Sequence, residues 1–303
     1  MAIHRRVSPL IYFTLSSMAL FPVGSFAGSA RDYLNAPVDA WLGFYNAGYS
    51  SSVTPEDGMD ITSDVRANVL SQSFMLTRTM DYWGRTGGLS LVLPYRYVET
   101  HSGDFRASTR GISDIGMLWQ INLFGGPALS REQFRSFIPE TFSSFHFYLG
   151  TPLGEYDAHS ALNPSSNRWV FSPTINYSYT PDQGWTWLET YITTTVFTTN
   201  DNYLVGGASK LAQDPLMVIE VHASRNITPE VWLSLDSYYN FGGETHIDNT
   251  SQDNAANTLR LGTGIGIRAW GGGDIIVNYE RVVAKPSQQP ESQTFRMTLR
   301  QFW

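Results

Sequence analysis

Hydrophobic and polar residues alternate along residues 292–303, the last segment of the chain. The apolar positions are Phe295, Met297 and Leu299, with Trp303 in the same phase, and the positions between them include Arg296 and Arg300. A period of two residues is typical of a β-strand with two different faces. An apolar face, a charged face and a terminal aromatic residue favour a strand of a closed barrel in lipid, with the apolar side outward. The last strand of a soluble sandwich would show the same pattern, so the remaining segments decide between the two.

From residue 40 onward the sequence reads as strand segments separated by turn-rich stretches. We predict twelve strands, over residues 40–53, 65–79, 87–98, 112–124, 141–150, 168–179, 185–198, 215–225, 231–241, 257–270, 274–283 and 292–303. Strands joined in this way predict an all-β fold, a transmembrane antiparallel up-and-down β-barrel. An even number of strands places both ends of the barrel on the same side of the membrane, which for an exported barrel is the periplasm.

The links between strands alternate in length, and this favours the membrane barrel over the sandwich. Residues 80–86, 180–184, 227–230 and 271–273 form short turns, whereas residues 54–64, 99–111, 155–167, 199–214 and 242–256 form links that are mostly longer and polar. Short periplasmic turns that alternate with longer outer loops are typical of bacterial outer-membrane barrels. A soluble sandwich has no physical reason to sort its loops in this way.

One link departs from the alternation, because residues 125–140 should be a periplasmic turn but are long. Ser130 and Gln133 have the spacing of a capping box, so we expect a short periplasmic helix that ends before Pro139. Its apolar face would consist of Phe134, Phe137 and Ile138. We expect this helix to cover the barrel rim; closure of the periplasmic mouth and contact with the membrane are the alternatives.

The amino-terminal sequence has the pattern of a secretory signal peptide. Arg5 and Arg6 precede a mainly apolar run over residues 7–23, and small residues follow it. We predict cleavage after Ala27, with cleavage after Ala30 as the second candidate. The expected division is a signal peptide over residues 1–27, a periplasmic amino-terminal segment over 28–39 and a barrel over 40–303, located in the outer membrane of a Gram-negative cell.

Composition narrows the function classes. The chain has 20 Lys and Arg against 27 Asp and Glu, and loss of the two signal-peptide arginines leaves 18 cations against 27 acids, a formal charge of −9. A negative chain without a basic patch argues against nucleic acid as a partner. The chain has no Cys, which excludes disulfides and thiolate chemistry. After the signal peptide no apolar run approaches the about 20 residues that a membrane-spanning helix requires.

Ionisable side chains of both signs are predicted on the inner faces of the strands. The candidate pore-lining residues are Glu189, Glu220, His222, Asp236, Arg260, Arg268, Glu280, Arg296 and Arg300. An Arg on the lipid face at mid-bilayer would cost about 2–4 kcal/mol, so the alternation fixes the register of each strand. The inward charges could orient polar solutes, or they could form salt bridges that brace the wall of a narrow barrel.

Two contacts between neighbouring strands follow from the expected turns. The final loop sets Glu280 diagonal to Arg296, and a hairpin folded about Thr228 sets Glu220 beside Asp236. Like charges at that second position would raise the pKa of one carboxylate.

The same hairpin could place His222 opposite Ser234, with Asp236 nearby, which superficially offers the three groups of a hydrolase. Such proximity often arises by chance and these positions lie in the middle of the wall. We therefore expect no catalytic residue and no enzyme activity.

The inner face of one strand lacks side chains at Gly262, Gly264 and Gly266. These glycines could leave room for a solute or for an inserted plug, or they could relieve crowding where the sheet coils strongly. Residues 29–37 are a candidate plug, although nothing in their sequence requires it.

Several segments resemble the "MetA-pathway of phenol degradation" outer-membrane family. They are GGLSLVLPY at 87–95, GISDIG at 111–116, TPLGEY at 151–156, SRNITPEVWLSLDSYYNFGGET at 224–245 and NTLRLGTGIGIRAW at 257–270. The resemblance runs through nearly the whole mature chain. It implies an outer-membrane barrel associated with the breakdown of aromatic compounds, and it carries over no functional residue because its motifs are turn and strand patterns.

We therefore expect an outer-membrane channel or transporter for the uptake of small aromatic or hydrophobic molecules. Tyr, Leu and Gly in the outer loops would capture the solute by desolvation and stacking. The other expected partners are outer-membrane lipid, lipopolysaccharide and the barrel-insertion machinery, whose recognition signal Trp303 resembles. We expect no cofactor and no metal. The alternative is a non-conducting barrel whose loops bind a partner.

Overall fold

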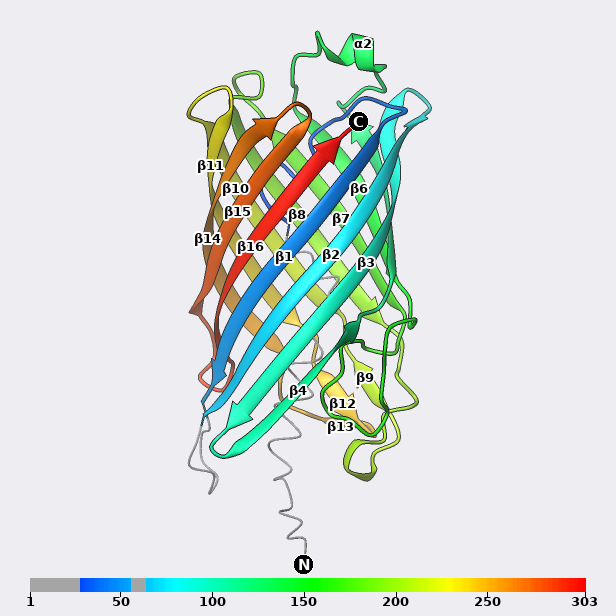
Figure 1. The fold of residues 1–303 in the computed structure, drawn as a ribbon, viewed down its shortest axis with the longest axis vertical. Coiled ribbons are helices and arrows are strands. Elements are labelled where there is room, and N and C mark those ends of the chain that lie inside the picture. The colour runs from blue at the N-terminus through cyan, green and yellow to red at the C-terminus, as the bar shows by residue number, and fades with distance from the viewer. Residues whose placement is uncertain (1–27, 56–63) are drawn as a thin grey trace, which may run out of the picture.

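The computed structural model describes residues 28–55 and 64–303, so the signal peptide predicted over 1–27 lies outside the described residues. The described chain forms a closed antiparallel β-barrel whose strands tilt around the long axis (Figure 1). The barrel closes because the first and last strands pair, with Leu42 opposite Phe302 and Val53 opposite Glu291. None of the helices in these residues is long and apolar enough to cross a membrane.

Twelve long strands in the described residues form the wall, and they confirm the predicted transmembrane up-and-down barrel. They are β1 (Trp41–Thr54), β2 (Val65–Tyr82), β3 (Arg85–Ser102), β5 (Gly116–Phe124), β6 (Phe142–Gly150), β7 (Val170–Tyr179), β8 (Thr186–Phe197), β10 (Leu216–Asn226), β11 (Val231–Gly242), β14 (Ala256–Trp270), β15 (Gly273–Ala284) and β16 (Glu291–Phe302). Trp41 and Trp303 exchange two backbone hydrogen bonds of 3.0 Å. The barrel therefore starts and finishes at the same end, which also carries the short turns and which we call the short-turn end (upper end in Figure 1).

The opposite end, the long-loop end, holds more β-structure than predicted. The strand predicted over 112–124 begins only at Gly116, and the loop predicted over 99–111 is a hairpin, because β3 continues to Ser102 and turns into β4 (Phe105–Ile112). In β4 only Phe105 and Ala107 stand out on the less exposed face, and two apolar positions are too short a period to mark a strand.

Two other long loops contribute a small separate sheet. β9 (Leu211–Gln213), β12 (Thr245–Ile247) and β13 (Thr250–Ser251) pair in the order β13-β12-β9, and the 3-10 turn η1 (Val205–Gly207) precedes them. The links predicted over 199–214 and 242–256 are therefore ordered by pairing with each other. The link predicted over 54–64 lies mostly outside the described residues.

The helix predicted in the long link at the short-turn end is present as α2 (Arg131–Phe134). Its capping box is confirmed: the Gln133 backbone N–H donates to Ser130 Oγ (3.2 Å), and the Ser130 N–H donates to Gln133 Oε1 (2.9 Å). Phe137 stacks on Phe134 at a centroid distance of 5.3 Å. No residue of α2 is buried, and the helix lies at the barrel rim (Figure 1).

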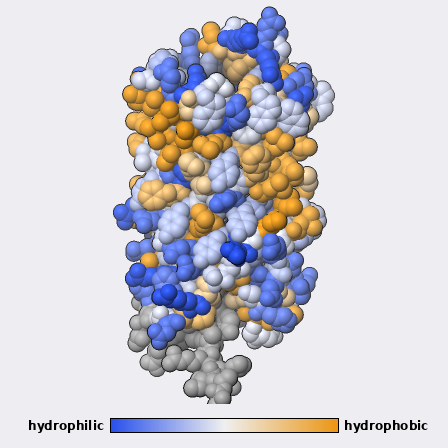
Figure 2. Space-filling view, in the orientation of Figure 1, coloured by the Kyte–Doolittle hydropathy of each residue, from blue (hydrophilic) through white to orange (hydrophobic). Residues whose placement is uncertain are grey.

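The outer surface of the wall is apolar, as the alternation predicts. In β3, Leu89, Leu91 and Leu93 are 46–47% exposed, whereas Ser90 and Val92 between them are 2% and 1% exposed. Figure 2 shows apolar side chains gathered over the wall, with polar side chains at both ends. Tryptophans surround the short-turn end, namely Trp41, Trp83, Trp185, Trp270 and Trp303, all at least 40% exposed. Such a belt is typical of a membrane–water boundary.

A charge on this outer surface should destabilise the barrel. Leu91 lies between Leu76 and Met117 of the adjacent strands. We expect Leu91→Arg to lower the free energy of unfolding in lipid by about 2–4 kcal/mol, because a guanidinium at mid-bilayer loses its water. Urea unfolding of the protein refolded in vesicles measures this change. Leu153→Arg, at a loop position that is 67% exposed, is the control and should cost less than about 0.5 kcal/mol; equal losses would contradict a lipid-facing Leu91.

Candidate functional site in the barrel lumen

Residues 28–37 run inside the barrel, from its interior to the short-turn end, and we call them the plug segment. Gly28, Ser29, Ala30 and Arg31 are buried. The hydroxyl of Tyr238 donates to the Gly28 carbonyl oxygen over 3.1 Å. The candidate plug over residues 29–37 therefore does begin in the lumen, where the wall offers polar partners to its backbone.

Arg31 is the main polar anchor of the plug segment. Its guanidinium donates to Ser224 Oγ (2.8 Å), Asn226 Oδ1 (2.5 Å) and the Trp185 carbonyl oxygen (3.3 Å). Its backbone N–H donates to Glu189 Oε2 (2.8 Å), and the guanidinium carbon lies 5.1 Å from the ring centroid of Trp232. The φ of Arg31 is 68°, a left-handed conformation that costs free energy in a residue with a side chain. The four hydrogen bonds offset that cost.

Aromatic rings hold the next part of the plug segment. The ring centroid of Tyr33 lies 3.8 Å from that of His146 and 5.0 Å from that of Tyr191. His146 is buried, and its Nε2 lies 2.7 Å from Ser144 Oγ, as expected for a hydrogen-bonded wall residue. The hydroxyl of Tyr191 donates to Glu189 Oε1 (2.9 Å). Glu189 therefore connects the aromatic contacts of the plug segment to its backbone contact.

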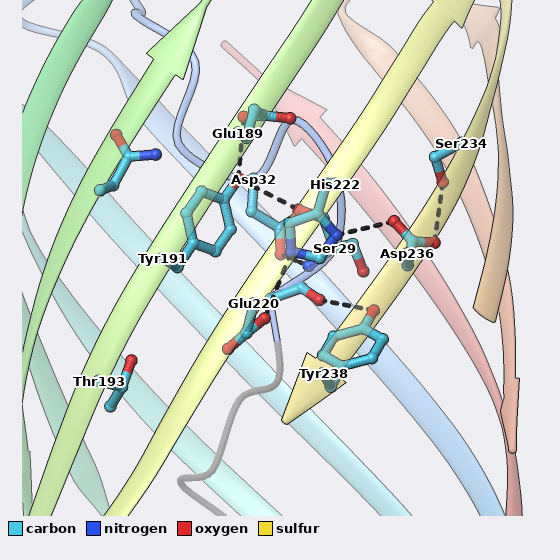
Figure 3. A network of polar contacts seen from close by, with 12 residues as sticks. Ser29, Asp32, Glu189, Tyr191, Thr193, Glu220, His222, Ser234, Asp236 and Tyr238 are labelled. Carbon is cyan, nitrogen blue, oxygen red and sulfur yellow. Dashed lines mark hydrogen bonds and ion pairs between the residues drawn. The ribbon is translucent and has the colours of Figure 1, made fainter. Parts of the chain in front are cut away.

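His222, Glu220 and Asp236 form a buried carboxylate–histidine cluster (Figure 3). Gly28 lies next to Glu220 of this cluster. His222 Nδ1 lies 2.7 Å from Asp236 Oδ1, and His222 Nε2 lies 3.4 Å from Glu220 Oε2. The three side chains are at most 2% exposed. The hydroxyl of Ser234 donates to the second oxygen of Asp236 (2.9 Å). The imidazole is thus held between two carboxylates from adjacent strands.

The register of β10 and β11 differs by two residues from the prediction. Glu220 lies opposite Tyr238 and His222 opposite Asp236, so the expected pairing of Glu220 with Asp236 was wrong, as was that of His222 with Ser234. The turn is centred on Pro229 rather than Thr228, because the Ile227 N–H donates to the Val231 carbonyl oxygen and closes the hairpin there. A shift of two residues keeps each side chain on its predicted face.

This arrangement is not that of a serine hydrolase. A triad requires the serine hydroxyl to pair with the imidazole, whereas Ser234 donates to Asp236 and the free side of His222 faces Glu220. Among residues 28–55 and 64–303 no group of three or more His, Asp or Glu side chains could hold a metal ion.

A second group of ion pairs lies on β14, β15 and β16. Arg260 Nη1 is 2.8 Å from Glu280 Oε1, and Arg296 Nη2 is 3.5 Å from Glu280 Oε2. The predicted diagonal contact between Glu280 and Arg296 is therefore confirmed. Since one carboxylate pairs with two guanidinium groups, these charges brace three neighbouring strands.

The two remaining predicted pore-lining residues lie elsewhere. Arg300 Nε donates to Asp274 Oδ2 (2.9 Å) near the short-turn end. Arg268 is exposed at the end of β14 and does not belong to either buried group. A role of the inward side chains in lining a solute path stays a prediction.

The glycine stripe of β14 accommodates large side chains of the neighbouring strands. A Cβ on Gly266 would lie 2.1 Å from Cε2 of Trp232, so the indole occupies the space that a side chain would fill. The same indole lies beneath the Arg31 guanidinium. Because Gly266 has no side chain, the Trp232 indole can lie in this space, where it contacts Arg31 of the plug segment.

Apolar side chains pack together at the long-loop end. We define the outer apolar cluster as the buried residues Val98, Leu162, Tyr203, Val205 and Leu211 together with Val69, Phe105, Ala107, Ala161, Ala208 and Ile247, which pack against them. Ala161 packs against both halves of this cluster. The carboxylate of Asp114 accepts the backbone N–H (2.8 Å) and the hydroxyl (2.6 Å) of Ser166 and fixes the loop that carries Leu162. Burial raises the pKa of Asp114 above its usual value.

The sequence did not point to Arg31 or Tyr33 as contacts within the lumen, whereas the alternation over residues 231–241 places Trp232 on the inner face, where it is buried. A signal for Arg31 was available, since it is the only cation between residues 28 and 65. An isolated cation next to a barrel whose inner face carries carboxylates is a candidate partner for one of them. Nothing comparable marks Tyr33 among many aromatic residues.

The closed ring of strands, the apolar outer surface and the ion-paired lumen together define an outer-membrane type of β-barrel. The sequence matches the family described as "Putative MetA-pathway of phenol degradation" over residues 45–296. The chain belongs to this family, which confirms the resemblance noted in the sequence.

Solved structures share the fold. The COG4313 outer membrane channel from Pseudomonas putida F1 is similar over 91% of this chain and 100% of that chain, with a TM-score of 0.78 and 19% identity. The β domain of the Bordetella autotransporter BrkA matches 88% of this chain and 100% of that chain, with a TM-score of 0.55 and 11% identity. The transport unit of the autotransporter AIDA-I from Escherichia coli matches 95% of this chain and 96% of that chain, with a TM-score of 0.51 and 12% identity. No curated protein matches the sequence.

Filling the space at Gly266 should loosen the plug segment. Gly266→Val would displace Trp232 from beneath Arg31. Because the chain has no Cys, Ala30→Cys introduces a single thiol whose labelling rate reports release of the plug segment. We expect that rate to rise about tenfold, the scale of one lost cation–π contact and its packing. Gly271→Val is the control, since no atom lies within 4 Å of a Cβ there; equal labelling rates in both variants would contradict the role of Gly266.

Proposed function

We propose that this protein is an outer-membrane channel of a Gram-negative bacterium for the uptake of small hydrophobic or aromatic molecules. The observation that carries the proposal is the outer apolar cluster, which lies at the long-loop end of a membrane barrel with a polar lumen. The name of the family, phenol degradation, and the channel from Pseudomonas putida F1 with the same fold support it. The channel needs no cofactor and no catalytic residue.

Solute capture takes place at the long-loop end. Transfer of an apolar molecule from water to apolar side chains is favourable in proportion to the area buried. Phe105 and Tyr203 add ring faces on which an aromatic solute can stack. Three loops and the β3–β4 hairpin contribute to the outer apolar cluster, so a small rearrangement of these loops exposes the binding surface.

Passage requires the plug segment to move. Its residues are held by hydrogen bonds from several wall strands, which makes the segment a gate between the lumen and the periplasm. Pro37 accepts a hydrogen bond from Thr79 (2.7 Å) close to the start of β1, so the segment stays tethered when it leaves the lumen. The gradient of the solute and its consumption inside the cell would drive the flux.

The wall has its own partners in this proposal. The apolar outer surface contacts lipid and lipopolysaccharide, and β16 with Trp303 is the strand that the barrel-insertion machinery would recognise. Neither contact requires a residue of the lumen.

A non-conducting barrel that binds a partner is the second candidate. The β3–β4 hairpin and the small sheet of β9, β12 and β13 give the long-loop end an ordered surface, which a partner-binding protein would use. The lumen of such a barrel stays closed under all conditions, so conductance separates the two functions.

Removal of the Arg31 side chain should open the channel. Arg31→Ala loses three side-chain hydrogen bonds and the contact with Trp232. We expect the open probability of single channels in a planar bilayer to rise at least about tenfold, since each hydrogen bond of a charged group contributes about 1.5–3 kcal/mol. A phenolic solute added on the long-loop side should block the openings.

Arg225→Ala is the matched control, because Arg225 is 65% exposed and its partners lie outside the lumen. This variant should behave like the parent protein. A folded Arg31→Ala barrel that remains silent would exclude the proposed gate and favour the partner-binding function.

A further inference from the structure

Gly28 packs directly against a buried carboxylate. An ideal Cβ on Gly28 would lie 2.8 Å from Cε2 of Tyr191 and 3.2 Å from Glu220 Oε2. Only a residue without a side chain fits here unless the wall moves. The Tyr238 hydroxyl holds the Gly28 carbonyl oxygen from another side. The beginning of the plug segment is therefore fixed within reach of the Glu220 carboxylate (Figure 3).

The Glu220 carboxylate is buried, and its one ion-pair contact, with His222, is long. Its side chain is 2% exposed, and neither Glu220 Oε2 nor His222 Nε2 has a hydrogen-bond partner among the described residues. The 3.4 Å between these two atoms is long for a charged pair, while His222 is held more closely by Asp236, at 2.7 Å. A buried oxygen that is left unpaired costs about 1–3 kcal/mol, and more when it carries charge. A positively charged hydrogen-bond donor close to Glu220 Oε2 would remove this cost.

Charge counting among the ionisable groups of this part of the lumen gives the same result. Five carboxylates lie there, those of Asp32, Glu189, Glu220, Asp236 and Glu280. The guanidinium groups of Arg31, Arg260 and Arg296 supply three positive charges, and the His222 imidazole between its two carboxylates can supply a fourth. One further cation would balance the group. Buried charges in proteins are paired or hydrogen-bonded, so one positive charge is missing from this part of the lumen.

Gly28 is also the residue that cleavage after Ala27 would make the first. Cleavage there turns an amide nitrogen into an α-ammonium with three donors, one bond away from the Cα that faces Glu220. We infer that signal-peptide cleavage after Ala27 creates the missing partner of Glu220, and that the resulting ion pair between the Gly28 α-ammonium and Glu220 seats the plug segment only in the processed protein.

The contacts of the plug segment distinguish this cleavage from cleavage after Ala30. The second cleavage would delete Gly28 and Ser29, and Ser29 Oγ donates to Asn278 Oδ1 (3.0 Å). It would also remove Ala30, which is 0% exposed and packs with Trp232 and Ile276. A barrel that begins at Arg31 would leave an unfilled space and an unpaired carboxylate in the lumen. This inference holds for a conducting or a non-conducting barrel.

The first test is the intact mass of the protein extracted from outer membranes. We expect a mature chain that starts at Gly28. A chain that starts at Arg31, or at any residue other than Gly28, overturns the inference without any measurement of transport.

The second test asks whether the α-ammonium acts through Glu220. Two refolded proteins are compared, one released by a site-specific protease so that Gly28 is first and one with a single Ser added before Gly28. Both carry Ala30→Cys for thiol labelling. We expect the added residue to accelerate labelling about tenfold, the scale of one broken charged hydrogen bond.

Glu220→Gln should abolish the difference between the two proteins, because the charge that recognises the ammonium is gone. Glu230→Gln, in the exposed turn after β10, is the matched control and should preserve the difference. A difference that survives Glu220→Gln, or the absence of any difference in the parent pair, overturns the ion pair. Circular dichroism confirms that each variant has refolded before it is labelled.

Discussion

The pairing of β1 with β16 is the constraint on which the rest of the structure depends. In lipid each unpaired backbone N–H or C=O costs several kcal/mol, so a sheet can cross a membrane only when it has no open edge. Closure also fixes the diameter. Barrels of about eight strands are filled by their own side chains, and barrels of 16 or more leave an aqueous channel. Twelve strands lie between these limits, which is why a plug segment of a few residues suffices to occupy the interior.

Closure has an electrostatic consequence as well. Because alternation sends every second side chain inward, the residues excluded from lipid are concentrated in a narrow space with little water. Charges there have to pair with one another. Glu280 pairs with Arg260 and Arg296 across three strands, and Glu189 and the His222 cluster have the plug segment as a neighbour. The plug segment is therefore best understood as part of the charge balance of the lumen, and not as an inert obstruction.

The parts of the fold that the sequence predicts are those with a local physical signature. Strands facing lipid alternate in polarity, turns contain Gly, Pro or Asp, and the capping box of Ser130 and Gln133 fixes a helix start. The errors arise where that signature is absent. β4 has only Phe105 and Ala107 as apolar positions in its period of two. A hairpin centred on Thr228 or on Pro229 gives the same faces. The contacts of the plug segment join residues as far apart as Ser29 and Asn278, 249 positions along the chain, and no local pattern can predict such a pairing.

The two ends of the lumen use different chemistry, and in the proposed channel this limits how a solute can release the plug segment. A ligand shifts an equilibrium only through its different affinities for the two states. An apolar solute in the outer apolar cluster touches neither Arg31 nor Glu189. It also has no polar groups that could replace the hydrogen bonds of these two residues. Capture at the long-loop end therefore does not release the plug segment by itself. The force that releases it has to act where the segment leaves the lumen, between Pro37, the start of β1 and the loop of α2, whose Leu129 carbonyl oxygen accepts the Val38 N–H over 2.9 Å.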